Sequence, residues 1–229
     1  KDAIMQLFER PFKVKGERIT FSAAICGIIN VQEMKEIDLL IDYLEYLVQL
    51  KPKSDRTILI QNDQHTKEGF LYEQEVKKYM ATAIERDLFE VYYQPVYSTA
   101  KNDFVTLEAL SRLHHPELGW IAPDVFIQIA EKNHMIEQIT DLQFKRVCMF
   151  INEHRDLMKK LFNIKVNLSS LDLMRSDCSS HFIRMMDDMD IHHDWIQFEI
   201  TETTYIHNID AVNQICLLYT SDAADDLIG

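Results

Sequence analysis

The sequence contains little glycine and proline, no long apolar run and less positive than negative charge. Five glycines and five prolines among 229 residues, with 47% hydrophobic residues, exclude a collagen-like repeat and a disordered chain. The longest apolar stretch, residues 21–31, contains Ser22 and Asn30 and is shorter than the roughly 20 residues that a membrane-spanning helix needs. The composition therefore predicts a soluble globular chain without a membrane-spanning helix.

Positive charge and cysteine are both too sparse for several classes of function. The chain has 24 Lys and Arg against 37 Asp and Glu, a net charge of −13, so we expect no polymeric nucleic-acid partner. Four cysteines, at positions 26, 148, 178 and 216, show no metal-finger spacing, which predicts reduced thiols in a cytoplasmic protein. The chain begins with Lys1 and has no signal peptide, so we expect its true N-terminus, and any membrane anchor there, to be missing.

The first 70 or so residues have the pattern of a small α+β remnant. We expect strands over residues 18–29 and 57–60, and a helix over residues 37–50 in which Leu40, Tyr43, Leu44 and Leu47 recur at helical spacing. A second helix, from about Gly69 to the edge of the next strand, is predicted to join two domains.

From residue 89 onward, predicted strands alternate with helices, which indicates an α/β domain with a largely parallel sheet. Strands are expected over residues 90–94, 104–110, 164–168 and 195–201. Helices are expected over residues 123–133, 136–154 and 180–189. Only nine residues join the first two strands, too few for a helical crossover, so these two are predicted to be antiparallel.

Three of these strands alternate between one apolar and one polar face. Glu108, Asn167 and Glu199 lie on the polar sides and near the predicted carboxyl ends. A polar face in contact with solvent is the simpler interpretation. The alternative is a closed barrel, in which the polar face points inward and functional side chains gather at the carboxyl ends.

Two carboxylates and an amide carbonyl are hard oxygen donors, which suit Mg²⁺ or Mn²⁺ and not zinc. A divalent ion with open positions can lower the pKa of bound water and polarise a phosphorus centre, so this set points to phosphoester hydrolysis. Arg112 follows the second predicted strand by two residues and would supply a bidentate cation for phosphate oxygens.

Five ordered sequence blocks resemble the EAL domain family of bacterial phosphodiesterases, which open cyclic di-GMP to the linear dinucleotide pGpG. The blocks are Tyr93-Gln94-Pro95, Glu108-Ala109-Leu110-Ser111-Arg112, the group Pro123, Phe126-Ile127 and Ala130-Glu131, Val166-Asn167-Leu168-Ser169, and Glu199-Ile200-Thr201-Glu202. Their order and spacing over about 110 residues make this resemblance specific.

The resemblance implies roles for individual residues. Glu108, Asn167 and Glu199 correspond to metal ligands, and Gln94 and Arg112 to substrate contacts. Glu202 corresponds to a second glutamate that supports a neighbouring active-site loop, so the implied catalytic set is Glu108, Glu199 and Glu202. Glu131 also matches a family position, although on a helix it could serve only to hold the fold together.

The amino-terminal part resembles, more weakly, the closing portion of a GGDEF domain, through residues 19–27 and the helix at residues 38–50. Val48-Gln49-Leu50-Lys51 replaces the Ala-Lys that usually closes that helix. We therefore expect a degenerate regulatory or packing module and assign it no diguanylate cyclase activity.

The chain is expected to hold only the first half of an EAL barrel, because a barrel of this class takes about 250 residues and eight strand–helix units. The family's aspartate pair with Phe-Gly, and its later lysine, glutamate and glutamine motifs, are absent after Glu199. Residues 216–225 resemble a translated sequencing adapter. The expected domains are 1–68 GGDEF-like, 69–88 linking helix, 89–215 the EAL half, and 216–229 a non-native tail.

The sequence therefore predicts an incomplete TIM-like (β/α) barrel preceded by an α+β remnant. The parent is predicted to be a Mg²⁺- or Mn²⁺-dependent cyclic di-GMP phosphodiesterase, with this chain inactive by itself. One alternative is a degenerate receptor that binds cyclic di-GMP without cleaving it, and another is a purely structural interaction domain. A homodimer through the EAL domain and an upstream sensor domain are further partners that the resemblance allows.

Overall fold

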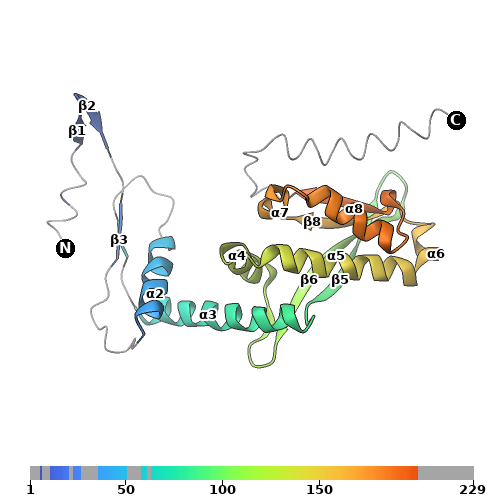
Figure 1. The fold of residues 1–229 in the computed structure, drawn as a ribbon, viewed down its shortest axis with the longest axis horizontal. Helices are drawn as coiled ribbons and strands as arrows, with labels where there is room; N and C mark the ends of the chain where they lie inside the picture. The colour runs from blue at the N-terminus through green and yellow to red at the C-terminus, as the bar shows by residue number, and fades with distance from the viewer. Residues whose placement is uncertain are drawn as a thin grey trace. The chain divides into compact units, whose positions relative to one another are not determined.

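A computed structural model describes residues 6, 11–20, 23–26, 36–50, 58–60 and 63–200. The chain divides into two compact units, Lys1–Glu75 and Val76–Gly229, and each is described by itself (Figure 1). The boundary lies inside helix α3 (Gln64–Glu85). The domain boundaries predicted from the sequence remain predictions.

The first unit contains two small sheets and helix α2 (Ile37–Gln49). Strands β1 (Phe12–Val14) and β2 (Glu17–Ile19) form an antiparallel hairpin. Lys15 and Gly16 connect them with φ of 49° and 91°, the positive angles that a two-residue hairpin turn requires. Strand β3 (Ala24–Cys26) pairs in parallel with β4 (Ile58–Ile60).

The single strand predicted over residues 18–29 is therefore wrong. Its first residues belong to a hairpin and its middle residues to a parallel pair, because each segment finds a different partner strand. Its last residues, 27–29, lie outside the described residues. The helix predicted over residues 37–50 is confirmed as α2, and the strand predicted over residues 57–60 is confirmed as β4, with Thr57 outside the described residues.

Helix α3 begins earlier than the predicted start at Gly69 because Asp63 and Thr66 cap it. The Thr66 backbone N–H donates to Asp63 Oδ1 at 2.8 Å, and the Asp63 backbone N–H donates to Thr66 Oγ1 at 3.1 Å. This reciprocal pair satisfies amide groups that a helix start leaves without partners. In the same unit, Tyr43 of α2 packs on Phe70, with ring centroids 4.9 Å apart.

The second unit is built on a mixed sheet in the order β5-β6-β8-β9, with β7 paired to β6. The strands are β5 (Glu90–Ser98), β6 (Asp103–His115), β7 (Gly119–Ile121), β8 (Asn163–Leu168) and β9 (Ile196–Ile200). The β5–β6 pair is antiparallel, as the short connection predicted, while β6, β8 and β9 are parallel.

Several details of the predicted strands are wrong, among them the end of β5, which continues to Ser98 instead of ending at Gln94. Strand β6 continues to His115 because β5 pairs with it as far as Arg112 and β7 pairs with its last three residues. Strand β7 was not predicted, since three residues are too few to show a periodicity. Trp195 ends the short 3₁₀ helix η2 (His193–Trp195) instead of starting the last strand.

Helices cover one face of this sheet. They are α4 (Pro123–Lys132), α5 (Ile136–Glu153), α6 (Arg155–Met158), α7 (Ser170–Met174) and α8 (Cys178–Asp188). Three of them lie close to the predicted ranges, whereas the short α6 and α7 were not predicted. The main core joins the sheet to α5 and α8 through Leu107, Ala109, Phe144, Val147, Cys148, Ile164, Val166, Phe182, Met186 and Ile196. Among the described cysteines, the thiols of Cys148 and Cys178 are buried and that of Cys26 is partly exposed.

The architecture is that of an incomplete (β/α) barrel: parallel strands, crossover helices on the apolar face, and a second face lined with polar side chains. No helix in the described ranges is long and apolar enough to cross a bilayer.

Candidate functional site

The register of the parallel strands brings the predicted metal ligands onto one face. Asn167 of β8 is paired with Glu199 of β9, and Glu108 of β6 is paired with Lys165, two residues before Asn167 on β8. Residues two apart in a strand share a face, so these side chains are neighbours. Glu108 lies in the middle of the long strand β6 and not near its end, which corrects the prediction, whereas Asn167 and Glu199 are each the penultimate residue of their strand.

Hydrogen bonds and an ion pair connect this polar face across the three strands. Asn167 Nδ2 donates to Glu108 Oε1 at 2.9 Å. Lys165 Nζ forms an ion pair with Glu199 Oε1. One level toward the strands' amino ends, Thr106 Oγ1 donates to Asn163 Oδ1 at 3.2 Å, and Asn163 Nδ2 donates to Gln197 Oε1 at 3.0 Å.

The donor set on this face fits a hard divalent cation. It offers carboxylates from Glu108 and Glu199 and an amide oxygen from Asn167, the ligand types of Mg²⁺ and Mn²⁺. Within the described residues, no group of three His, Cys, Asp or Glu side chains is arranged to hold an ion, so an ion here would depend on the amide oxygen as well. Asn167 now directs its amide nitrogen toward Glu108, and the amide would have to turn to offer its oxygen instead.

The two predicted substrate contacts come from the antiparallel pair. Gln94 is paired with Glu108, and Arg112 with Glu90. Arg112 lies inside β6, not beyond it as predicted, because the strand is longer. Its guanidinium donates to the Ser111 carbonyl at 2.9 Å and lies 5.7 Å from the Tyr92 ring centroid.

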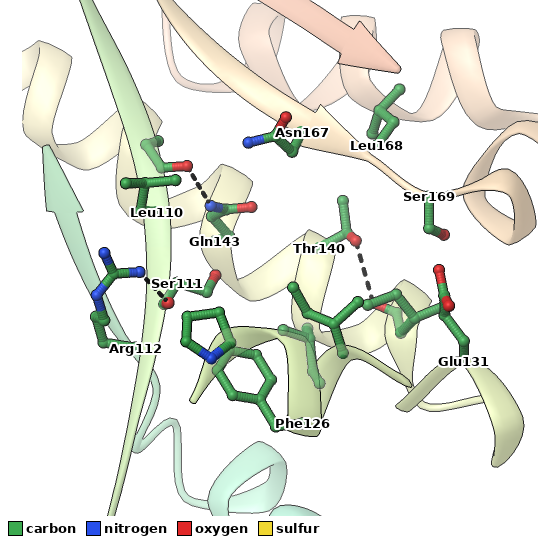
Figure 2. A pocket seen from close by; sticks show the side chains of 15 residues that line it. Leu110, Ser111, Arg112, Phe126, Glu131, Thr140, Gln143, Asn167, Leu168 and Ser169 are labelled. Carbon is green, nitrogen blue, oxygen red and sulfur yellow. Dashed lines mark hydrogen bonds between the residues drawn. The ribbon is translucent and has the colours of Figure 1, made fainter. Parts of the chain in front are cut away.

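A pocket of about 100 Å³ adjoins the polar face. Figure 2 shows Arg112 on one side of it and Glu131 and Ser169 on another, with Asn167 at its border. Asn167, which lines the pocket, is also hydrogen-bonded to Glu108. Gln143 reaches into the same region from α5 and donates to the Ala109 carbonyl at 2.8 Å.

Two carboxyl groups near the pocket have raised pKa values. Asp172 is fully buried; burial raises its pKa, while hydrogen bonds from Ser169 and Thr140 act in the opposite direction. Its Oδ1 atom is buried and has no hydrogen-bond partner among the described residues. Burial, and after it the Asp172 charge, raises the pKa of Glu131. Glu131 belongs to helix α4 and also lines the pocket. Glu202 lies outside the described residues.

Sequence reasoning missed the roles of Lys165, Gln143 and Asp172. Lys165 was visible as a polar-face residue, but its partner depends on the register between β8 and β9. Asp172 follows Ser169 by three residues and closes a capping box on α7, a spacing that is recognisable in a sequence.

Comparison with known proteins assigns this barrel-like α/β unit to a family. The family model described as EAL domain matches residues 78–221, more than half of the chain. The chain therefore belongs to the EAL domain family. The match extends beyond residue 215, where native sequence was predicted to end.

Among curated proteins, the chain is similar to the cyclic di-GMP phosphodiesterase NbdA of Pseudomonas aeruginosa, with 28% identity over 138 residues, 60% of this chain and 18% of that protein. It is also similar to the probable cyclic di-GMP phosphodiesterase PdeN of Escherichia coli K12, with 30% identity over 139 residues, 61% of this chain and 27% of that protein. The chain thus spans about a quarter or less of the length of these relatives.

Solved structures share the fold. The PaMucR phosphodiesterase in complex with c-di-GMP matches with a TM-score of 0.55 and 24% identity, over 62% of this chain and 60% of that one. The FimX EAL domain of Pseudomonas aeruginosa bound to c-di-GMP matches with a TM-score of 0.54 and 21% identity, over 61% and 55%. These similarities establish the fold that the sequence predicted, an α/β unit of the EAL barrel type.

Proposed function

We propose that this chain is part of a cyclic di-GMP phosphodiesterase that hydrolyses its substrate to linear pGpG with Mg²⁺ or Mn²⁺. The observation that carries the proposal is the arrangement of Glu108, Asn167 and Glu199 on one polar face beside the pocket that Arg112 lines. Membership of the EAL family and the names of the relatives support the same reaction.

Glu108, Asn167 and Glu199 would hold the divalent ion. When bound, the ion would lower the pKa of a water molecule and polarise the phosphorus centre. For the ion to bind, Asn167 exchanges its hydrogen bond with Glu108 for an oxygen contact, and Glu199 exchanges its contact with Lys165. Both carboxylates are needed to offset the ion's charge.

Arg112 and Gln94 would bind and orient the dinucleotide. The Arg112 guanidinium uses one N–H group on the Ser111 carbonyl, and a guanidinium has five such groups, enough to bind phosphate oxygens as well. Gln94 lies opposite Glu108 on the neighbouring strand, close to where the scissile phosphate would meet the ion. Glu202 is proposed to support the adjoining loop.

The finer predictions belong to the same proposal. Residues 1–68 are taken as a degenerate GGDEF-like module, residues 69–88 as a linking helix, 89–215 as half of the EAL barrel and 216–229 as a translated adapter. By itself the chain is expected to be inactive, because half a barrel leaves an open sheet edge and an incomplete coordination sphere. A cytoplasmic location, a homodimer through the EAL domain and an upstream sensor domain are proposed for the parent.

The test begins with the intact locus from the source genome, since an uninterrupted native frame through residues 216–229 would refute the adapter interpretation. The purified parent, incubated with cyclic di-GMP and Mg²⁺ or Mn²⁺, is expected to release pGpG, measured by chromatography. Glu108→Gln and Glu199→Gln should each lower the rate at least about a hundredfold. Glu153→Gln, an exposed carboxylate at the end of α5, is the matched control and should leave the rate unchanged.

Two results would contradict the proposal. A parent that neither binds nor cleaves cyclic di-GMP would contradict the proposed substrate. Metal-dependent hydrolysis of cyclic di-GMP by the 229-residue chain alone would contradict the prediction that this chain is inactive.

The ion pair between Lys165 and Glu199 favours a second candidate, a receptor that binds cyclic di-GMP without cleaving it. An ammonium group already neutralises one of the predicted metal ligands, which would suit a site that retains the nucleotide and holds the ion weakly. Calorimetric binding of cyclic di-GMP by the parent without pGpG release would favour this function. No binding at all would favour a structural interaction domain.

A further inference from the structure

The polar face contains a resident positive charge that the EAL assignment does not explain. Lys165 extends from β8 to contact Glu199 on β9, and the two side chains are only 26% and 35% exposed. Lys165 is two residues before Asn167, on the same face of the same strand. It therefore lies within the group of side chains proposed to hold the metal ion.

Its neighbours direct Lys165 toward Glu199. Gln197, the residue paired with Lys165 on β9, accepts a hydrogen bond from Asn163, and both of these side chains are neutral. Glu108, the other nearby carboxylate, accepts a hydrogen bond from Asn167. Among the described ion pairs, Glu199 is the partner of Lys165. The lysine side chain is long enough to reach Glu199, which lies one row further along the sheet, opposite Asn167.

We propose that Lys165 is a built-in cation that competes with the divalent metal for Glu199 and so weakens metal binding. This inference rests on the proposed metal site. An ion bound to Glu199 either displaces the ammonium from Oε1 or binds beside it and is repelled, because two positive groups so close interact unfavourably in a partly buried setting. A partly exposed ion pair is a modest interaction, so we expect the weakening to be about two- to fivefold in Kd.

Lys165 has a second effect when no metal is present. It offsets the charge of Glu199, a partly buried carboxylate for which the described part of the chain offers no other ion-pair partner. The face can thus fold in the absence of an ion, and metal binding adds less stability than it would at an uncompensated carboxylate pair. Removing the ammonium should therefore lower stability without metal and increase the stabilisation that metal gives.

The experiment measures Mn²⁺ binding to the full 229-residue chain by calorimetry and by the electron paramagnetic resonance signal of free Mn²⁺. Lys165→Met removes the charge and keeps the length of the side chain, and Lys165→Arg keeps the charge. Lys101→Met is the matched control, since Lys101 lies over the Phe162 ring, 3.4 Å from its centroid. Circular dichroism checks that each variant is folded.

We expect Lys165→Met to bind Mn²⁺ about two- to fivefold more tightly than the unchanged chain, and Lys165→Arg and Lys101→Met to bind as the unchanged chain does. The thermal midpoint of Lys165→Met should be lower without metal and should rise more on addition of Mn²⁺. An equal Mn²⁺ affinity for Lys165→Met and the unchanged chain overturns the proposal, and so does binding too weak to detect in both.

A double variant separates this inference from the proposed function. Glu199→Gln in the Lys165→Met background should reverse the gain in affinity; a gain that persists overturns the competition for Glu199. Failure of the parent to cleave cyclic di-GMP would refute the phosphodiesterase but would not alter this comparison of Mn²⁺ affinities.

Discussion

The two faces of the sheet in the second unit are held together in different ways. Under α5 and α8, the apolar face buries aliphatic and aromatic side chains completely, among them Phe144, Val166 and Phe182. On the opposite face, partly exposed side chains such as Glu108 and Asn167 are connected by single hydrogen bonds and one described ion pair. The first face supplies stability through burial, and the second leaves charged groups available for a ligand.

This difference implies that stability and ligand binding can be altered separately. A substitution on the apolar face removes buried area and leaves a cavity, which is costly. A substitution on the polar face removes one partly solvated hydrogen bond, which contributes little net stability. The predictions below follow that order, from the largest expected effect to the smallest.

Phe144→Ala should lower the free energy of unfolding by about 3–5 kcal/mol. Phe144 is fully buried, and its ring centroid lies 4.7 Å from that of Phe182 and 5.6 Å from that of Phe198. Urea unfolding followed by tryptophan fluorescence measures the change, since both tryptophans, Trp120 and Trp195, belong to the second unit. Met149→Ala, at a 45% exposed position of the same helix, should cost less than about 0.5 kcal/mol.

The buried thiols test whether the apolar face is closed. Burial raises the pKa of Cys148 to about 12, and the pKa of Cys178 to about 12 as well. In a chain with Cys26→Ser and Cys216→Ser, Ellman's reagent near pH 8 should therefore react about a thousandfold more slowly than with an exposed thiol. Reaction in urea is the control, and a rapid phase in the native chain would show that this face opens.

Asp172→Ala should cost about 2–3 kcal/mol. The buried carboxylate accepts hydrogen bonds from the Ser169 amide at 2.9 Å and the Ser169 hydroxyl at 2.8 Å, and its removal leaves these donors without an acceptor. Thr140 Oγ1, 3.0 Å away, retains the Ile136 carbonyl as an acceptor. Equilibrium urea unfolding measures the loss, and a cost below about 0.5 kcal/mol would contradict it.

The same residue determines a pH dependence. Because the folded-state pKa of Asp172 is raised, its stabilising contribution is complete below the unfolded pKa of about 3.9 and is lost as pH rises through the folded pKa. Asp172→Asn, which does not ionise, should therefore gain stability relative to the unchanged chain as pH rises from about 4. Asp188→Asn, at an exposed position, is the control and should show no such trend.

Asn167→Ala should cost only about 0.5–1.5 kcal/mol, because its hydrogen bond to Glu108 is partly solvated. Stabilisation by Mn²⁺ should nevertheless disappear, since the amide oxygen is a proposed ligand. Thermal unfolding with and without Mn²⁺ measures both effects. Unchanged stabilisation by Mn²⁺ would remove Asn167 from the ligand set.

Thr106→Val should have the smallest effect, less than about 1 kcal/mol. It removes the 3.2 Å hydrogen bond to Asn163 and keeps the shape of the side chain, in the row below the proposed ligands. Mn²⁺ binding, measured by calorimetry, should not change. A change greater than about twofold would show that the two rows of the polar face are coupled.

Much of the fold could be predicted because its long elements repeat a clear pattern. The alternation in β8 and β9 and the helical spacing in α5 are visible in the residues themselves, since burial selects apolar side chains at every second or every third and fourth position. Short elements such as β7 and α7 were missed, as three to five residues cannot establish a period. The start of α3 was missed because a side-chain cap, not a periodicity, sets it.

The candidate site was predictable in its residue types and less so in its contacts. The order and spacing of the sequence motifs selected Glu108, Asn167 and Glu199 as candidate metal ligands and Arg112 as a candidate substrate contact. The contact of Lys165 with Glu199 could not be predicted, because the partner of a long side chain depends on which rows of neighbouring strands are aligned. The buried Asp172 acquires its raised pKa only from the helices that exclude water around it.

The sequence by itself determined which residues form strands and helices, which face of each strand is apolar, and which family the motifs resemble. These properties follow from local periodicity and residue chemistry. Only the tertiary structure decided that Asn167 directs its amide nitrogen toward Glu108, that Lys165 neutralises Glu199, and that Arg112 lies inside a strand at the border of a pocket. These contacts join residues tens of positions apart, so they depend on strand register and helix packing, which no single segment specifies.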